Sequence, residues 1–280
     1  HKEYRRQRQM CIRDRDKLAD ILRQAARSEI MPRFRRLSAG DIREKTSAVD
    51  LVTEADEAAE RAIEAACRQA FPDAAFVGEE GVAANAGLID KVAGADLAIV
   101  VDPIDGTANF ASGAPMFGVM AAVVRKGETI AGVIYDPLGD DAMVGERGGG
   151  VFFKSGDEAA KRMQYAGPVP LADMVGAAAT SQLPLEQRRR TLAGFGETRI
   201  LSSFRSAAQE YRLALSGALH YLYYVKLMPW DHLAGAMMCQ EAGAYVRRLD
   251  GSVYLPGHVA GGLLVAPDEA GWHDLRAVIG

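Results

Sequence analysis

The sequence predicts a mixed α/β protein, of the α+β kind, that is built in layers. Apolar residues with a helical period alternate along the 280 residues with short β-rich runs, which favours sheets covered by helices. The composition, with 49% hydrophobic and 25% charged residues, is ordinary for a globular chain. The longest apolar runs, such as residues 97–101, are far shorter than the roughly 20 residues of a membrane span. We therefore expect no membrane partner.

The first half should contain two helices and a strand in this order. Apolar residues recur with helical spacing from about Asp16, and Pro32 should end or kink that first helix. A second helix should follow Thr53, because Asp56 stands three residues on, at capping-box spacing. Residues 74–80 predict a short strand that ends in two acids.

The rest of the chain predicts strands and helices in alternation. Residues 96–101 indicate a strand buried on both faces. Two hairpins are expected, over residues 116–136 and 141–156. Further strands are expected near residues 175–180, 199–203 and 218–225, and helices near 184–194, 206–216 and 231–241. We expect one domain over residues 16–280 in two packed halves, about 16–150 and 151–280, with the seam at residues 148–150 or 165–172.

Charge is unevenly distributed, since residues 1–36 carry 12 Lys/Arg against 5 Asp/Glu. A basic arm of this kind can bind nucleic acid. Residues 1–15, however, lack apolar periodicity, and we expect them to be an unstructured arm extraneous to the fold. A nucleic-acid partner is not expected, because the arm has no interleaved aromatic or glycine residues. Three scattered cysteines and the lack of an apolar leader favour a reducing cytoplasm.

The stretch VDPIDGTANF, residues 101–110, carries more acid than a turn requires. Asp102 and Asp105 follow an apolar run, with Pro103 between them and Gly106 after. Residues 106–109 can begin a helical turn whose free N–H groups favour an anion. Carboxylates beside an anion need a cation between them, and hard oxygen ligands select Mg²⁺. An Asp-Gly turn with an incidental second acid explains the stretch equally well.

Two other acidic sites follow apolar elements. VGEEG supplies Glu79 and Glu80, and PWDHLAG supplies Asp231 directly after Trp230. Taken alone, a solvated loop explains the first site better, and a helix N-cap explains the second. Together with residues 101–110 they could converge on one metal-rich pocket, although spacing alone does not prove this.

The segments GEE, DPIDGTANF and WDHLAGAMMCQEAGA, preceded by VDLVTEAD, resemble the inositol monophosphatase family. The resemblance extends over about residues 16–275. It implies a layered α-β-α-β-α sandwich that is often dimeric, with two or three Mg²⁺ ions per active site and sensitivity to lithium. It also implies hydrolysis of a small phosphate monoester, such as an inositol or sugar phosphate, by an activated water.

The resemblance also implies roles for particular residues. The implied Mg²⁺ ligands are Glu79, Asp102, Asp105, Asp231 and the backbone carbonyl of Ile104. Thr107, together with Glu79, would position and activate the attacking water, with support from Asp56 and Lys45. The implied substrate contacts are Asp105, Gly106, Thr107, Ser206, Ala207 and Asp231, with backbone groups of several of them holding the phosphate.

The chain departs from the family pattern at the expected substrate pocket. Tyr224 stands where inositol-specific members carry an acid, and Arg205 stands where the family usually carries glycine. Tyr224 should lie beside the leaving group, and Arg205 could bind a carboxylate or second phosphate, although a surface or dimer contact explains it equally well. We therefore expect inositol 1-phosphate not to be the best substrate.

Several activities stay open at this point. Within the enzyme class they are fructose-1,6-bisphosphatase, histidinol-phosphate phosphatase and phosphoadenosine-phosphate phosphatase. Outside it, the chain could be a nucleic-acid or protein-binding module that uses its basic arm.

Overall fold

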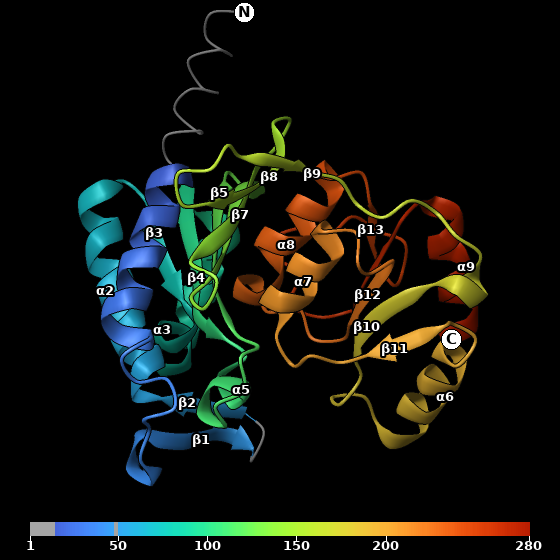
Figure 1. Cartoon of the computed structure of the whole chain (residues 1–280), viewed down its shortest axis with the longest axis horizontal. Coiled ribbons are helices and arrows are strands. Elements are labelled where there is room, and N and C mark those ends of the chain that lie inside the picture. The colour runs from blue at the N-terminus through green and yellow to red at the C-terminus, as the bar shows by residue number, and fades with distance from the viewer. Residues whose placement is uncertain (1–14, 48–49) are drawn as a thin grey trace, which may run out of the picture.

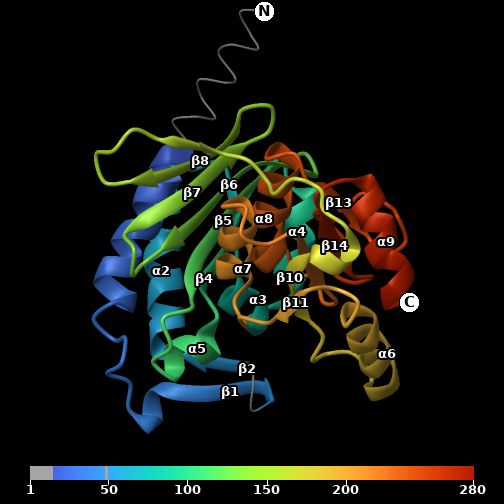
Figure 2. The same cartoon turned by 45° about the vertical axis from the view of Figure 1, so that its right-hand side comes forward.

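The computed structural model describes residues 15–47 and 50–280, arranged in five layers of alternating helices and sheets (Figure 1). The outer helical layer consists of a helix over residues 15–25, its continuation η1 (Ala26–Ile30), and α2 (Glu54–Ala70). A seven-stranded sheet, a central helix pair, a five-stranded sheet and a second outer helix pair follow (Figure 2). The predicted α-β-α-β-α sandwich is confirmed. Among the described residues, no helix has the length and apolar character to span a membrane.

The larger sheet has the strand order β3-β4-β5-β6-β7-β8-β9, in which only β3 and β4 are parallel. Its strands are β3 (Ala75–Gly78), β4 (Leu97–Asp105), β5 (Gly118–Arg125), β6 (Glu128–Asp136), β7 (Asp141–Glu146), β8 (Gly150–Ser155) and β9 (Lys161–Met163). Both predicted hairpins are present. The first turns at Lys126 and Gly127, which both have positive φ, as a tight hairpin turn requires.

The smaller sheet has the strand order β11-β10-β12-β14-β13. Its strands are β10 (Val175–Ala179), β11 (Ile200–Ser202), β12 (Tyr221–Tyr224), β13 (Tyr245–Arg248) and β14 (Leu263–Ala266). Because β8 and β9 still belong to the larger sheet, the chain changes sheets between Met163 and Val175. This change lies where the second of the two possible seams, residues 165–172, was expected. The division of the chain into two halves near residue 150 stays a prediction.

The remaining helices cover the two sheets. The longer ones are α6 (Leu185–Phe195), α7 (Ala207–Leu215), α8 (Pro229–Glu241) and α9 (Glu269–Ile279). The shorter ones are η2 (Ala39–Asp41), α3 (Glu79–Ala84), η3 (Ala86–Ile89), α4 (Asp90–Gly94), α5 (Thr107–Ala111) and η4 (Leu171–Asp173). The pair α7 and α8 packs between the sheets, and α6 packs with α9 on the far face of the smaller sheet (Figure 1).

Local sequence patterns account for the outer helices. Leu18 and Leu22, on the apolar face of the first helix, are completely buried against α2 and the larger sheet. At the start of α2, the backbone N–H of Thr53 donates to Asp56 Oδ2 (2.9 Å), which confirms the predicted capping box. Cys67 and Cys239 are free and buried in the core.

Two predicted boundaries were wrong. The strand expected over residues 74–80 ends at Gly78, and the acids at 79 and 80 begin α3. The strand expected over residues 96–101 continues through Asp105, with an irregular register after Asp102. The sequence patterns also did not predict the antiparallel hairpin of β1 (Ile42–Ser47) and β2 (Asp50–Thr53), whose residues 48 and 49 lie outside the described part of the chain.

Candidate active site

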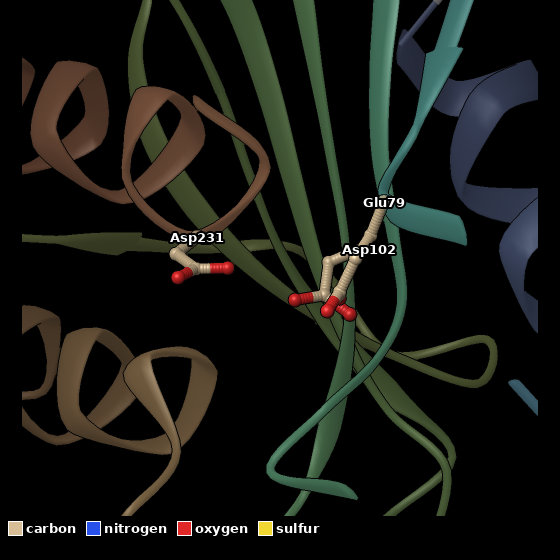
Figure 3. A group of neighbouring side chains, drawn as sticks. All are labelled: Glu79, Asp102 and Asp231. Atoms are coloured by element: carbon tan, nitrogen blue, oxygen red, sulfur yellow. The ribbon is translucent and has the colours of Figure 1, made fainter. Parts of the chain in front are cut away.

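Three carboxylates from three separate elements converge at one end of the larger sheet. Glu79 lies in the first turn of α3, Asp102 on β4 and Asp231 in the first turn of α8. Each offers one oxygen atom, and these oxygens all lie within 4.8 Å of one another. Figure 3 shows Glu79 and Asp102 side by side, with Asp231 facing them from α8. Because β3 and β4 are parallel neighbours, α3 begins next to the acid-bearing end of β4, and α8 packs over β4.

The electrostatics of this cluster fit a bound cation. Asp102 is buried, and its burial, followed by the charges of Glu79 and the other acids, raises its pKa well above the ordinary value. The same causes raise the pKa of Asp231. Three carboxylates so close together are stable in the ionised form only when a positive charge lies between them. Oxygen-only ligands of this kind suit Mg²⁺.

Lys45 ties the β1–β2 hairpin to the acidic cluster. Its Nζ lies 2.8 Å from Glu79 Oε1 and 2.6 Å from Glu80 Oε1. Burial by itself would lower the pKa of Lys45, but the two carboxylates outweigh burial and raise it. Lys45 therefore stays protonated and neutralises part of the negative charge.

Glu60 on α2 holds the start of α3 and was not predicted. Its carboxylate accepts hydrogen bonds from the backbone N–H groups of Glu80 (2.8 Å) and Gly81 (2.7 Å). A Cβ atom at Gly78 would lie only 2.3 Å from this carboxyl group, so the contact requires glycine there. Burial raises the pKa of Glu60 to about 7. An acid on the alanine-rich buried face of α2 was the sequence signal for this role.

Asp105 lies outside the three-carboxylate cluster and contacts the N-terminus of α7. It accepts hydrogen bonds from Ser206 Oγ (2.5 Å), Ala207 N (3.1 Å) and Ala208 N (2.7 Å). Burial raises its pKa to about 6 against the opposing effect of these bonds. The groups of Ser206 and Ala207 that were expected to hold phosphate thus hold Asp105. The phosphate role of these groups, and the metal roles of Asp105 and the Ile104 carbonyl, stay predictions.

Thr107 and Asp56 form a hydrogen-bonded pair at the start of α5. Thr107 Oγ1 lies 2.9 Å from Asp56 Oδ1 and 3.0 Å from the carbonyl oxygen of Ile104, and its single proton can go to either. Burial raises the pKa of Asp56 to about 7. Gly106, directly before, has a φ of 89°, and a Cβ there would lie 2.9 Å from the carbonyl oxygen of Met116. Glycine at this position therefore allows the sharp turn from β4 into α5.

Tyr224 lies in a buried aromatic cluster. Its ring centroid is 4.4 Å from that of His232 and 5.4 Å from that of Tyr211. Among the described residues, its hydroxyl has no partner with good hydrogen-bond geometry. Burial, and after it the nearby charge of Glu210, raises the pKa of Tyr224. Arg205 is exposed beside the start of α7. Contacts of Tyr224 and Arg205 with a substrate stay predictions.

The histidines near these elements have structural partners. His232 Nε2 lies 3.0 Å from the Lys226 carbonyl, and burial lowers the His232 pKa to about 3. His220 Nδ1 accepts from the backbone N–H of Val175 (3.1 Å), and His258 Nδ1 accepts from that of Leu255 (3.1 Å).

The five-layer sandwich and the three carboxylates that converge beside its larger sheet place this chain among layered α/β proteins that have a candidate metal site. The chain belongs to the inositol monophosphatase family, whose model matches residues 14–277. It is 34% identical over 211 residues to an inositol-1-monophosphatase of Mesorhizobium japonicum, covering 72% of this chain and 73% of that one.

Other relatives carry different names. The chain is 32% identical over 262 residues to "Nus factor SuhB" of Pseudomonas aeruginosa, covering 88% of this chain and 91% of that one. It is 31% identical over 216 residues to a "Fructose-1,6-bisphosphatase/inositol-1-monophosphatase" of Thermotoga maritima, covering 75% and 76%. Among solved structures, the extragenic suppressor protein SuhB of Bartonella henselae superposes with a TM-score of 0.79 at 26% identity, covering 94% and 97%.

Proposed function

We propose that the chain is a Mg²⁺-dependent phosphatase that hydrolyses a small phosphate monoester with water as the nucleophile. The observation that carries the proposal is the convergence of Glu79, Asp102 and Asp231, whose charges require a cation. Membership of the family supports the reaction class. The same three carboxylates would hold the metal, with Asp105 and the Ile104 carbonyl as further ligands. Bound Mg²⁺ would supply charge neutralisation at the phosphate and a lowered pKa for water.

The residues of the chain itself would orient the water. When Thr107 donates its hydroxyl proton to Asp56, the lone pairs of Thr107 Oγ1 are free to accept a hydrogen bond from a water. Asp56, with a pKa of about 7, is suited to receive a proton near neutral pH. Lys45 holds the Glu79 carboxylate in place.

The test is a screen for phosphate release over a panel of phosphate monoesters, with and without Mg²⁺. We expect release only with the metal, and we expect Asp231→Asn or Asp105→Asn to lower it by at least ~100-fold, as when transition-state charge stabilisation is lost. Undiminished release in a chelator, or in these variants, would refute the proposal.

The alcohol part of the substrate is the finer question. Inositol and sugar phosphates are the first candidates, and the bisphosphatase name of the Thermotoga relative supports including fructose 1,6-bisphosphate in the panel. Histidinol phosphate and phosphoadenosine phosphate complete it. We further propose a cytoplasmic homodimer, which light scattering on the purified protein and fractionation of the cell would test.

A non-enzymatic role as a nucleic-acid or protein-binding module is the alternative. The name Nus factor belongs to the Pseudomonas relative. In this chain the excess of basic residues lies in positions 1–36, of which 1–14 are outside the described residues. Binding of an RNA by the full chain that is lost when residues 1–14 are removed, together with absence of phosphate release, would favour this alternative.

A further inference from the structure

Within the described residues, four residues other than glycine have a left-handed backbone: Arg35, Lys126, Asp140 and Arg205. This conformation is costly for any residue with a Cβ and persists where the surroundings enforce it. Lys126 needs it for the two-residue turn of a hairpin. The side chains of Asp140 and Arg35 each make hydrogen bonds that explain their positions. Among the described residues, the Arg205 side chain makes no such bond.

The Arg205 side chain is exposed and free. Over residues 15–47 and 50–280, its guanidinium meets no hydrogen-bond acceptor and no carboxylate within ion-pair distance. An arginine in this position thus contributes nothing to the fold that glycine would not contribute with less strain. The positive charge itself is then the feature that needs an explanation.

The residues on both sides of Arg205 are anchored by hydrogen bonds, one of them to Asp105. The N–H of Phe204 donates to the buried carboxylate of Glu210 (3.0 Å), and its carbonyl accepts from Asn109 Nδ2 (2.7 Å). Ser206 Oγ donates to Asp105 Oδ2 (2.5 Å). These three bonds hold Arg205 at a φ of 56° and fix its Cα one residue, about 3.8 Å, from the residue that contacts Asp105.

An exposed guanidinium on a backbone that is held beside an acidic site has a specific chemical use. The carboxylates of the site repel any anionic group on a substrate other than the phosphate that the metal neutralises. The planar fork of arginine offers two parallel N–H donors that match a carboxylate or phosphate. We propose that Arg205 binds a second anionic group of the substrate, so that the preferred substrates are phosphate monoesters that carry a carboxylate or a second phosphate. This inference rests on the proposed phosphatase function and adds the substrate class.

The test compares pairs of esters that differ in the second charge. 2-Phosphoglycerate and glycerol 2-phosphate differ by a carboxylate against a hydroxymethyl group, and fructose 1,6-bisphosphate and fructose 1-phosphate differ by a second phosphate. For the wild type, we expect a higher kcat/KM for the charged member of at least one pair. Arg205→Gly should reduce that preference at least tenfold, mainly through KM, and Arg205→Lys should retain part of it.

Two controls separate charge from folding. Arg205→Gly should have an unchanged or higher melting temperature, because glycine relieves the left-handed strain. Arg35→Gly, which replaces the other left-handed arginine, should keep the wild-type preference. A change confined to the carboxylate pair or to the bisphosphate pair supports the inference and identifies the second group.

Equal effects of Arg205→Gly on both members of both pairs would overturn the inference, as would an equal loss of preference in Arg35→Gly. The proposed function fails instead if the wild type releases phosphate from no ester of the whole panel. If none of the four esters is hydrolysed, calorimetry measures their Kd values for wild type and Arg205→Gly. The ratio of Kd between the two members of each pair then takes the place of the kcat/KM ratio.

Discussion

Replacing Asp231 by asparagine should stabilise the protein when no divalent metal is present, and this advantage over wild type should largely disappear when Mg²⁺ is present. The reason is the repulsion among Glu79, Asp102 and Asp231, whose ligand oxygens lie within 4.8 Å of one another. Two unit charges at that distance repel by about 3.5 kcal/mol at an effective dielectric constant near 20. Asp231 has two such neighbours, so its charge costs about 7 kcal/mol in the metal-free protein at this dielectric constant.

Three effects reduce this figure. Lys45 neutralises part of the Glu79 charge. Protonation of one neighbouring carboxyl group removes one of the two repulsions on Asp231, and this protonation costs about 1.4 kcal/mol for each unit by which the pH exceeds the pKa of that group. Loss of the charge also removes a favourable interaction with the first turn of α8, worth about 0.3–1 kcal/mol. We expect a net stabilisation of about 3 kcal/mol, which corresponds to a rise in melting temperature of roughly 5–10 °C.

The assay is thermal unfolding of wild type and Asp231→Asn at pH 8, in chelator and in saturating Mg²⁺. A ligand at 100 times its Kd stabilises the wild type by about 2.7 kcal/mol, and the variant should lose most of this gain. Asp90→Asn is the matched control, because Asp90 also lies in the first turn of a helix but is exposed. A variant that is less stable than wild type in chelator, by the same margin as in Mg²⁺, would refute the charge-repulsion argument.

The pH dependence of the metal-free protein gives an independent check. The folded pKa values of Asp102 and Asp231 are raised above that of the unfolded chain, because burial and neighbouring acids disfavour the ionised forms. The folded state therefore binds more protons, and stability should be greatest below about pH 4 and fall as the pH rises through the folded pKa values. In Asp231→Asn the fall should be shallower. Urea unfolding in chelator at several pH values measures it, and parallel curves would contradict the explanation.

Three further predictions follow from the site and the fold. Glu60→Gln should raise the Mg²⁺ concentration for half-maximal activity about tenfold, because the side-chain amide of glutamine can accept only one of the two backbone N–H groups at the start of α3. The control is Glu54→Gln, an exposed position on the same helix, and an equal effect of both substitutions would refute this role of Glu60. Lithium should inhibit phosphate release, and activity that persists at high lithium would contradict the family's cation site. A chain beginning at Arg15, whose guanidinium lies over the ring of Phe152, should keep its melting temperature, and a large drop would show that residues 1–14 pack on the fold.

The elements with a strong local pattern were predicted well. The first helix, α2, the β5–β6 hairpin and α6 to α8 all lie within a few residues of their expected positions. Their periodicity, caps and turn residues act over a few neighbours, so the sequence displays them directly. The hairpin of β1 and β2 was missed because its short polar strands lack alternation, and it matters because it carries Lys45 to Glu79.

Residues near the site depended more on distant contacts. Glu79 and Glu80 lie in the first turn of a helix, where the carboxylate of Glu60, about twenty positions earlier, accepts from the backbone N–H groups of Glu80 and Gly81. Tyr224 was considered only as a neighbour of the leaving group, and the packing of its ring against His232 and Tyr211 was not foreseen. Neither arrangement could be derived from the neighbouring residues in the chain.

The sequence by itself determined the layered α/β class, the acidic segments and, through its motifs, the family. Only the tertiary structure decided that Glu79, Asp102 and Asp231 meet within 4.8 Å, that Asp105 contacts the start of α7, and that Arg205 is held in a left-handed backbone beside it. The physical reason is one of range. Helical periods, caps and turns arise between residues close in the chain, whereas the site combines segments more than 100 positions apart, which packing of the helices and sheets brings together.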